Sequence, residues 1–263
     1  MRKILLILLA LILASGIILI KDNRTDGIPV LCFHRIVKDD VKEKYYENNK
    51  WVSDKSTFEA EMKWLKDNCY ECLSLEEFYK LKHSGGDTSK KVLLTFDDGD
   101  YEFYYLVKPI LDKYDFKATM FLIGSKVGKT TAPLTYKRGR LGQDVISKME
   151  NVDFESHSYD LHEKRGWTEE FSPIKRGVAL SKYYLELKSD SEKTKGATAL
   201  AYPFGDYNAD YIKALKDSGY KMGFKFSYID QKKCNMETDD FQIPRIRVTG
   251  DMDLTDFVQA MRN

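Results

Sequence analysis

The sequence has no excess of charge of either sign and contains few cysteines or histidines. Forty-two basic residues are balanced by 41 acidic ones, for a formal net charge of +1. Without a strong positive field the chain lacks the attraction on which non-specific nucleic-acid binding depends, so nucleic acid is not expected as a partner. The length of 263 residues, 43% of them hydrophobic, instead predicts one large domain with its own core.

Cysteine is scarce, and its spacing does not complete a metal site. The four cysteines are Cys32, Cys69, Cys72 and Cys234. Cys69 and Cys72 have the spacing of a metal or redox pair, but no second pair or nearby histidine accompanies them. We interpret them as buried or unpaired thiols. Oxidation after export could still join two of the four, and the sequence leaves that pairing open.

Long hydrophobic runs are also absent, apart from Ile4 to Ile20 near the N-terminus. As a helix this run would be about 25 Å long, which is within the range of membrane-spanning helices. The small residues Ala14-Ser15-Gly16 are followed by more apolar residues, which favours an uncleaved anchor over a cleaved signal peptide. We expect residues 1–26 to form a membrane anchor and linker, and 27–263 an extracytoplasmic domain, secreted if the segment is cleaved.

Beyond the anchor, strand-like apolar runs alternate with helical patterns. The sequence predicts strands near 29–33, 92–96, 118–123, 152–156, 198–202, 221–226 and 243–248. It predicts helices near 57–68, 75–82, 102–114, 142–149, 172–187, 209–218 and 254–261, with longer loops at 39–55 and 124–140. Such alternation is typical of a mostly parallel α/β sheet, and about seven units favour a barrel over an open sheet. The chemistry of a barrel collects at the carboxyl ends of its strands.

Two adjacent carboxylates stand at one such strand end, in Thr95-Phe-Asp-Asp-Gly99. Consecutive strand side chains point to opposite faces, so Asp97 and Asp98 can serve one site only where the chain turns, and Gly99 permits that turn. Beside a metal, one carboxylate can ligate while the other takes a proton. An ordinary polar turn remains an equally good interpretation of this motif alone.

Two of the four histidines follow another predicted strand, in His157-Ser-Tyr-Asp-Leu-His162. Five residues on a helix correspond to about 140° of rotation, so the two share no helical face. They can converge if His157 ends the strand and His162 lies on the loop after it. With a carboxylate opposite, they would form a site of three ligands with a position left open for water, which is the catalytic arrangement.

Together with Pro203-Phe204-Gly205, these motifs occur in the order found in the polysaccharide deacetylases of carbohydrate esterase family 4, whose domain is called the NodB-homology domain. The chain resembles this family from Pro29 to Asn263. The resemblance implies a distorted (β/α)7 barrel. It also implies a divalent metal on Asp98, His157 and His162, and Asp97 as the general base. The family has a tyrosine at Phe204, whose backbone N–H is expected to stabilise an oxyanion.

Within the family, the chain is similar to the deacetylases of poly-β-1,6-N-acetylglucosamine. The five-residue histidine spacing, Ala201 in place of an arginine, and His34 after the first predicted strand carry this likeness. It implies that His34 is the general acid, and no histidine follows His162 to take that role. We expect Zn²⁺ as the metal, with Co²⁺ or Ni²⁺ as alternatives. A peptidoglycan or chitooligosaccharide deacetylase and a non-catalytic carbohydrate-binding relative remain as alternatives.

Other charged residues have less specific interpretations. The basic cluster Lys137-Arg-Gly-Arg140 is interpreted as solvated surface. Arg245 and Arg247 alternate with apolar residues. Two interpretations are open: one of the two arginines reaches the base or the substrate, or both pair with acidic loops. His83, at a predicted helix end, is interpreted as a surface residue.

Overall fold

The computed structural model describes residues 27–128, 130–132, 137–163, 196–226 and 232–262. Within these ranges, every helix is too short or too polar to span a bilayer. The expected anchor at 1–26 and the expected helix at 172–187 lie outside the described residues.

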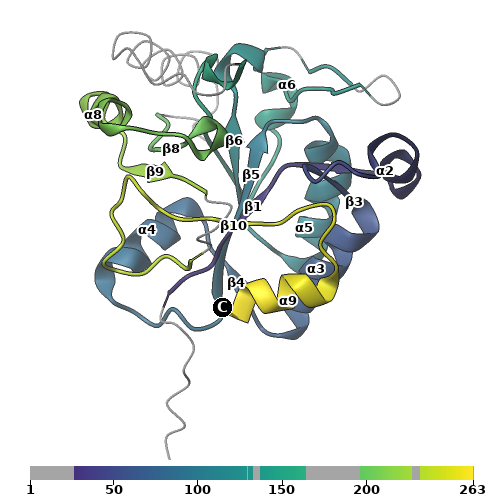
Figure 1. The fold of residues 1–263 in the computed structure, drawn as a ribbon, viewed down its shortest axis with the longest axis horizontal. Helices are drawn as coiled ribbons and strands as arrows, with labels where there is room; N and C mark the ends of the chain where they lie inside the picture. The colour runs from purple at the N-terminus through teal and green to yellow at the C-terminus, as the bar shows by residue number, and fades with distance from the viewer. Residues whose placement is uncertain (1–26, 129, 133–136, 164–195, 227–231, 263) are drawn as a thin grey trace, which may run out of the picture.

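A parallel sheet forms the centre of the molecule (Figure 1), with its strands in the order β10-β1-β5-β6-β7-β8-β9 and β4 paired beside β5. Every strand that the sequence predicts lies in this sheet. The strand bounds are β1 Val30–Phe33, β4 Glu71–Cys72, β5 Lys91–Asp98, β6 Ala118–Leu122, β7 Val152–Ser156, β8 Ala199–Ala201, β9 Met222–Phe224 and β10 Ile246–Arg247.

The two ends of the sheet approach each other without forming a regular ladder. Beyond β9, an isolated parallel bridge joins Phe224 to Ile243, the segment that leads into β10. The Lys225 amide donates to the Ile243 carbonyl at 2.9 Å. Of the expected distorted (β/α)7 barrel, the parallel α/β architecture is confirmed, in the form of a half-barrel whose end strands are linked by an isolated bridge.

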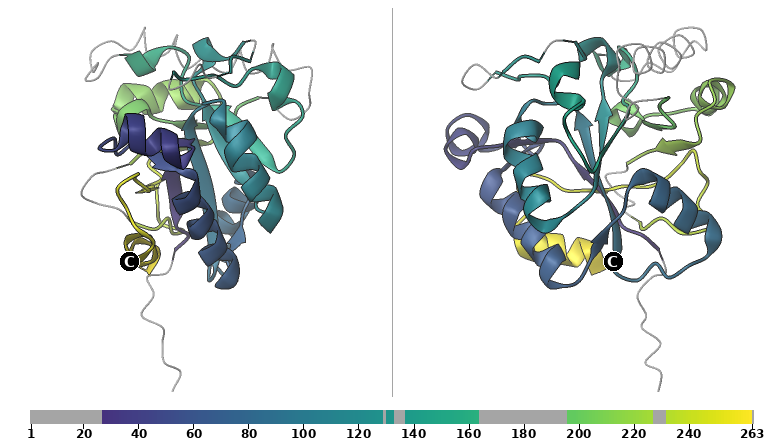
Figure 2. Two further views of the ribbon diagram at one scale, coloured as in Figure 1. Left: turned by 90° about the vertical axis from the view of Figure 1, so that its right-hand side faces the viewer. Right: turned by 180° about the vertical axis from the view of Figure 1, so that it is seen from behind.

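Helices cover the outside of the sheet, as the two further views in Figure 2 make clear. The α-helices are α2 Asp39–Tyr46, α3 Lys55–Asp67, α4 Leu75–Ser84, α5 Lys108–Tyr114, α6 Gln143–Ile146, α8 Ala209–Asp217 and α9 Leu254–Arg262. A π-helical turn η1 (Phe103–Val107) leads into α5, and short 3₁₀ turns are η2 Gly124–Lys126, η3 Leu161–Glu163 and η5 Pro203–Gly205. Local signals set several helix starts, such as the capping box of Ser74 and Glu77 at α4.

The predicted loop at 39–55 is wrong, because it contains regular structure. Helix α2 occupies residues 39–46, and the short strands β2 (Arg35–Val37) and β3 (Val52–Asp54) pair in parallel as a separate ribbon. The first turn of α2 carries Asp39 and Asp40, whose charges suit the positive end of a helix. The helix is too polar to give an apolar periodicity, which is why the sequence pattern did not indicate it.

Aromatic rings fill the core beneath the rim of the sheet. The Phe33 and Phe96 rings stack at 5.1 Å between centroids, and Phe58 of α3 meets Phe33 edge-to-face at 5.3 Å. All three side chains are almost completely buried. Because Phe33 precedes His34 and Phe96 precedes Asp97, this packing holds the ends of β1 and β5 at a fixed separation.

Candidate metal centre and catalytic pocket

The carboxyl end of β5 turns so that its two aspartates face different partners. Asp98 and Gly99 both have φ of +77°. The left-handed turn therefore begins at Asp98, one residue before the glycine that was expected to permit it. A Cβ at Gly99 would lie 2.7 Å from Leu122 Cδ2, so the position has no room for a side chain. The expected turn is confirmed, and it separates the surroundings of Asp97 from those of Asp98.

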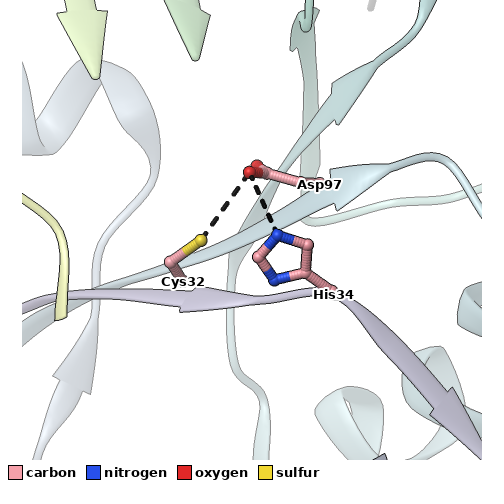
Figure 3. A group of neighbouring side chains, drawn as sticks. All are labelled: Cys32, His34 and Asp97. Carbon is pink, nitrogen blue, oxygen red and sulfur yellow. Dashed lines mark hydrogen bonds and ion pairs between the residues drawn. The ribbon is translucent and has the colours of Figure 1, made fainter. Parts of the chain in front are cut away.

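Asp97 lies among groups contributed by β1, by the residue that follows β1 and by the segment that leads into β10. Arg245 donates from Nη1 to Oδ1 at 2.7 Å and from Nη2 to Oδ2 at 2.8 Å. On the other side, Cys32 Sγ lies 3.7 Å and His34 Nε2 lies 3.9 Å from Asp97 Oδ2 (Figure 3). The base candidate is therefore bound by the residue before β10, and Cys32 of β1 and His34, which follows β1, approach it.

The charge of Asp97 follows from these neighbours. Burial alone would raise the pKa of this carboxyl, but the Arg245 guanidinium, helped by His157 and His34, holds the pKa well below its usual range. Asp97 is thus ionised and able to accept a proton. Arg245 is completely buried and binds both oxygens of Asp97, so of the alternatives that the sequence left open, this arginine reaches the candidate base.

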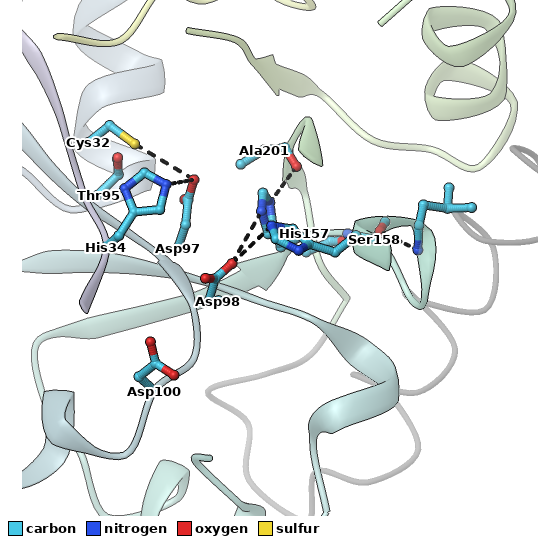
Figure 4. Close-up of polar contacts among 12 residues, drawn as sticks. Cys32, His34, Thr95, Asp97, Asp98, Asp100, His157, Ser158 and Ala201 are labelled. Carbon is cyan, nitrogen blue, oxygen red and sulfur yellow. Dashed lines mark hydrogen bonds and ion pairs between the residues drawn. The ribbon is translucent and has the colours of Figure 1, made fainter. Parts of the chain in front are cut away.

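Asp98 faces the two histidines, of which Figure 4 labels His157. Its Oδ1 lies 3.2 Å from His162 Nε2 and 3.7 Å from His157 Nε2. The ligand atoms of the three residues all lie within 4.8 Å of one another. His157 follows β7 directly and His162 lies on η3, which is the placement that the spacing required for convergence.

The chemistry of this donor set fits a divalent metal. His157 Nδ1 lies 2.8 Å from the Ala201 carbonyl, so Nδ1 carries the hydrogen and Nε2 offers its lone pair toward Asp98. Asp98 Oδ1 is buried with no hydrogen-bond partner among the described residues. Burial lowers the pKa of His157 and of His162, and this favours the neutral imidazoles that ligation needs.

His34 lies at the rim beside Asp97. Its side chain is only 11% exposed. The ring meets Trp51 at 4.6 Å and Phe226 at 6.3 Å, both edge-to-face. Burial lowers the pKa of His34, and the Asp97 carboxylate opposes part of that shift.

Phe204 closes the other side of the site from η5. Its φ of +59° bends the chain back, and its ring stacks on His162 with 4.7 Å between centroids. The aspartates, histidines and Phe204 line one cavity of about 330 Å³. The remaining lining residues are Arg35, Tyr46, Asn49, Trp51, Val52, Arg138 and Phe226.

The interpretation of 137–140 as solvated surface is wrong for its two arginines. Arg138 lies 3.1 Å from Asp98 Oδ2 and 3.3 Å from Asp100, and Arg140 donates to the Asp98 carbonyl at 2.9 Å. Asp100 is completely buried, and burial raises its pKa to about 6. Charge clusters in loops are usually solvated, and the sequence held no signal that this loop folds over the carboxylates.

Other sequence interpretations hold. His83 is a surface residue, 44% exposed and 3.3 Å from Asp240. All four cysteines are free thiols, and Cys72 is buried while Cys69 is exposed. Cys32, however, lies against the proposed base, a position that its place in an apolar run did not indicate.

The fold and the site together define a half-barrel enzyme with a candidate metal centre at the carboxyl ends of its parallel strands. A family profile described as polysaccharide deacetylase matches residues 84–223. The chain belongs to the polysaccharide deacetylase family and is an enzyme that catalyses N-deacetylation.

Individual proteins agree with this assignment. A Staphylococcus epidermidis protein named poly-beta-1,6-N-acetyl-D-glucosamine N-deacetylase is 33% identical over 235 residues, which cover 84% of this chain and 78% of that protein. A Staphylococcus aureus protein of the same name is 32% identical over 74% of this chain and 67% of its own length.

Solved structures have the same fold. The Streptococcus pyogenes deacetylase PplD, in complex with acetate, superposes with a TM-score of 0.74 at 25% identity, over 90% of this chain and 99% of that one. IcaB from Ammonifex degensii gives a TM-score of 0.67 at 21% identity, over 90% of this chain and 97% of that one. At the identity of the second pair, the likeness concerns the fold alone.

Proposed function

We propose that this enzyme removes acetyl groups from N-acetylglucosamine units of poly-β-1,6-N-acetylglucosamine and that it needs a divalent metal, with Zn²⁺ as the first candidate. The observation that carries the proposal is the convergence of Asp98, His157 and His162, with Asp97 outside their cluster. The position of His34 at the rim and the names of the staphylococcal relatives support this polymer over other N-acetylated sugars.

The side chains divide the chemistry between them. A divalent cation held by Asp98, His157 and His162 would supply Lewis-acid chemistry, polarising the acetamide carbonyl and lowering the pKa of water. Asp97, kept ionised and oriented by Arg245, takes the proton of the attacking water. His34 donates a proton to the departing amine, so that the amide C–N bond breaks and acetate leaves.

The backbone of Phe204 has a separate role in the proposal. Its N–H donates a hydrogen bond to the oxyanion that forms when water adds to the carbonyl. The positive φ at this residue and the stacking of its ring on His162 support the role, because both hold η5 against the pocket. A main-chain donor does not depend on a tyrosine hydroxyl at this position.

We further propose that residues 1–26 anchor the enzyme to the membrane and that residues 27–263 form the deacetylase domain outside the cytoplasm. The apolar run Ile4 to Ile20 supports this placement. A polymer substrate at the cell surface would be within reach of a domain tethered in this way.

Acetate release by the purified full chain tests the substrate and the metal together. We expect release from β-1,6-linked N-acetylglucosamine oligomers, loss of release with a chelator, and recovery on adding Zn²⁺. Chitin oligomers and peptidoglycan serve as matched substrates. Faster release from either of them would replace the proposed polymer, and chelator-resistant release would contradict the metal requirement.

A further inference from the structure

A second set of metal-binding side chains lies beside the proposed base. Cys32, His34 and Asp97 each offer one ligand atom, and these sulfur, nitrogen and oxygen atoms all lie within 4.8 Å of one another. Figure 3 shows the three side chains converging from β1 and β5. Both Cys32 and His34 approach Asp97 Oδ2, and no atom of the set is part of the Asp98 cluster.

The spacing suits a small, thiophilic cation. Zinc binds sulfur at about 2.3 Å and nitrogen or oxygen at about 2.0–2.2 Å, so neighbouring donors around one tetrahedral ion lie roughly 3.4–3.6 Å apart. The two distances to Asp97 Oδ2 are 3.7 Å from Cys32 Sγ and 3.9 Å from His34 Nε2. The third pair, Cys32 and His34, lies within 4.8 Å, so small side-chain rotations would bring all three donors onto one ion.

Arg245 leaves room for this ion although it binds both oxygens of Asp97. It donates one hydrogen bond to each oxygen, and a carboxylate oxygen has a second lone pair. On Oδ2 that second direction already faces the Cys32 thiol. A thiol loses its proton on binding a metal, so the thiolate and the carboxylate together would neutralise a divalent cation beside the arginine.

The site can be reached from the catalytic cavity. His34 and Asp97 both line that cavity, and Cys32 lies behind them with no exposed surface. An ion would therefore enter by the path that the substrate uses. Sulfur as the third donor favours Zn²⁺ or Cd²⁺ over hard cations such as Mg²⁺.

We propose that Cys32, His34 and Asp97 bind a second, inhibitory thiophilic cation, Zn²⁺ or Cd²⁺, separate from the cation at Asp98. One ion there occupies both Asp97 and His34, and so removes the base and the acid together. The inhibition rests on the proposed function, whereas the binding does not. The enzyme would accordingly be active with one equivalent of zinc and inactive with excess.

Cobalt titration of the purified full chain tests the binding without any assay of activity. The Asp98 cluster has no sulfur ligand, so the first equivalent of Co²⁺ should give no thiolate-to-cobalt charge-transfer absorption in the near ultraviolet. A second equivalent should give that absorption in the wild type and in Cys69→Ser, the matched control at an exposed thiol. Cys32→Ser should bind one equivalent and lack the absorption.

Two outcomes would overturn the second site: a wild-type stoichiometry of one, or thiolate absorption that persists in Cys32→Ser. Circular dichroism checks that this variant folds, and Cys32→Ala provides a second replacement of the same buried thiol. If both variants fail to fold, the wild-type stoichiometry and the absorption that accompanies the second equivalent decide the question.

Acetate release then tests the inhibition. With activity expressed relative to each variant's own maximum, excess Zn²⁺ should inhibit the wild type and Cys69→Ser, and at least tenfold more should be needed for Cys32→Ser. Equal inhibition of all three would overturn the inhibitory role. If no variant releases acetate, the proposed function fails, while the cobalt absorption still reports on the second site.

Discussion

Arg245 and Asp97, 148 positions apart in the sequence, form a two-bond ion pair at the carboxyl edge of the sheet. The two side chains are 0% and 1% exposed. A charge buried this deeply is tolerated because its partner is held in bidentate geometry. The pair therefore contributes to folding as well as to the orientation of the Asp97 carboxylate.

Removing one partner should be costly for stability. Arg245→Met leaves the Asp97 carboxylate buried without its counter-charge, and we expect the free energy of unfolding to fall by about 3–5 kcal/mol. Urea denaturation measures the change. Arg247→Met, at a partly exposed position two residues further on, is the matched control and should cost less.

The double variant Arg245→Met/Asp97→Asn separates stability from catalysis. Neutralising the orphaned carboxylate should recover most of the lost stability, because no unpaired charge is left. Acetate release should stay low, since the base is gone. Recovery of activity together with stability would contradict the assignment of Asp97.

The two adjacent aspartates should respond differently to the same replacement. Asp97→Asn should keep the metal and lower turnover by about 10²–10⁴-fold, the range of a general base. Asp98→Asn should lose the metal, because it removes a charged ligand that faces both histidines. Metal content by elemental analysis and acetate release are the two measurements. Metal retained by the Asp98 variant at wild-type affinity would be incompatible with the proposed ligand set.

Arg138 should weaken metal binding in the wild type. Its guanidinium lies 3.1 Å from Asp98 Oδ2 and therefore repels a cation held by the same carboxylate. Arg138→Gln is expected to bind Zn²⁺ more tightly in competition with a chromogenic chelator. Lys137→Gln, at an exposed neighbour, is the control and should leave the affinity unchanged. A weaker affinity in Arg138→Gln would mean that the arginine chiefly orients Asp98.

Glu61 should make the protein less stable as the pH rises, whereas a carboxylate paired with a cation makes a protein more stable as the pH rises. It is 1% exposed on α3, and burial, with a smaller effect of Asp54, raises its pKa from 4.5 to about 8. Between these two values the unfolded chain has lost a proton that the folded chain retains. The free energy of unfolding should therefore fall as the pH rises through this window.

Glu61→Gln isolates that effect. The variant should show a flatter dependence, and at about pH 9 it should be more stable than the wild type, because no carboxylate is buried. Urea denaturation at about pH 5 and about pH 9 measures the difference. Glu59→Gln on the same helix is the control. Lys113 lowers the pKa of Glu59, so the titration of Glu59 affects stability at a lower pH than that of Glu61. Parallel curves for wild type and Glu61→Gln would refute the assignment.

The sequence predicts much of the fold because apolar runs in parallel strands are continuous and conspicuous. Residues 92–96 and 118–123 could be identified as strands from composition alone, and β5 and β6 lie there. Helix α2 could not, because its sequence is polar and only its acidic first turn favours a helix. The ribbon of β2 and β3 depends on pairing between segments that carry no strong pattern of their own.

The sequence predicted those parts of the candidate site whose residues directly follow or end a strand, such as Asp98 and His157. It did not predict the parts whose role is decided by tertiary contacts. Arg138 belongs to a basic loop that resembles any solvated surface, and only the folded chain brings it to Asp98. Cys32 looked like an ordinary core residue, and its 3.7 Å contact with Asp97 depends on the register of β1 against β5.

The strand order also has a consequence for biosynthesis. In the sheet, β10 lies beside β1, which lies beside β5, and Arg245, the counter-ion of Asp97, is translated 148 positions after Asp97. A nascent chain that has produced β1 through β9 still has the Asp97 carboxylate without Arg245. The enzyme should therefore gain its activity only after β10 has been translated and has paired with β1.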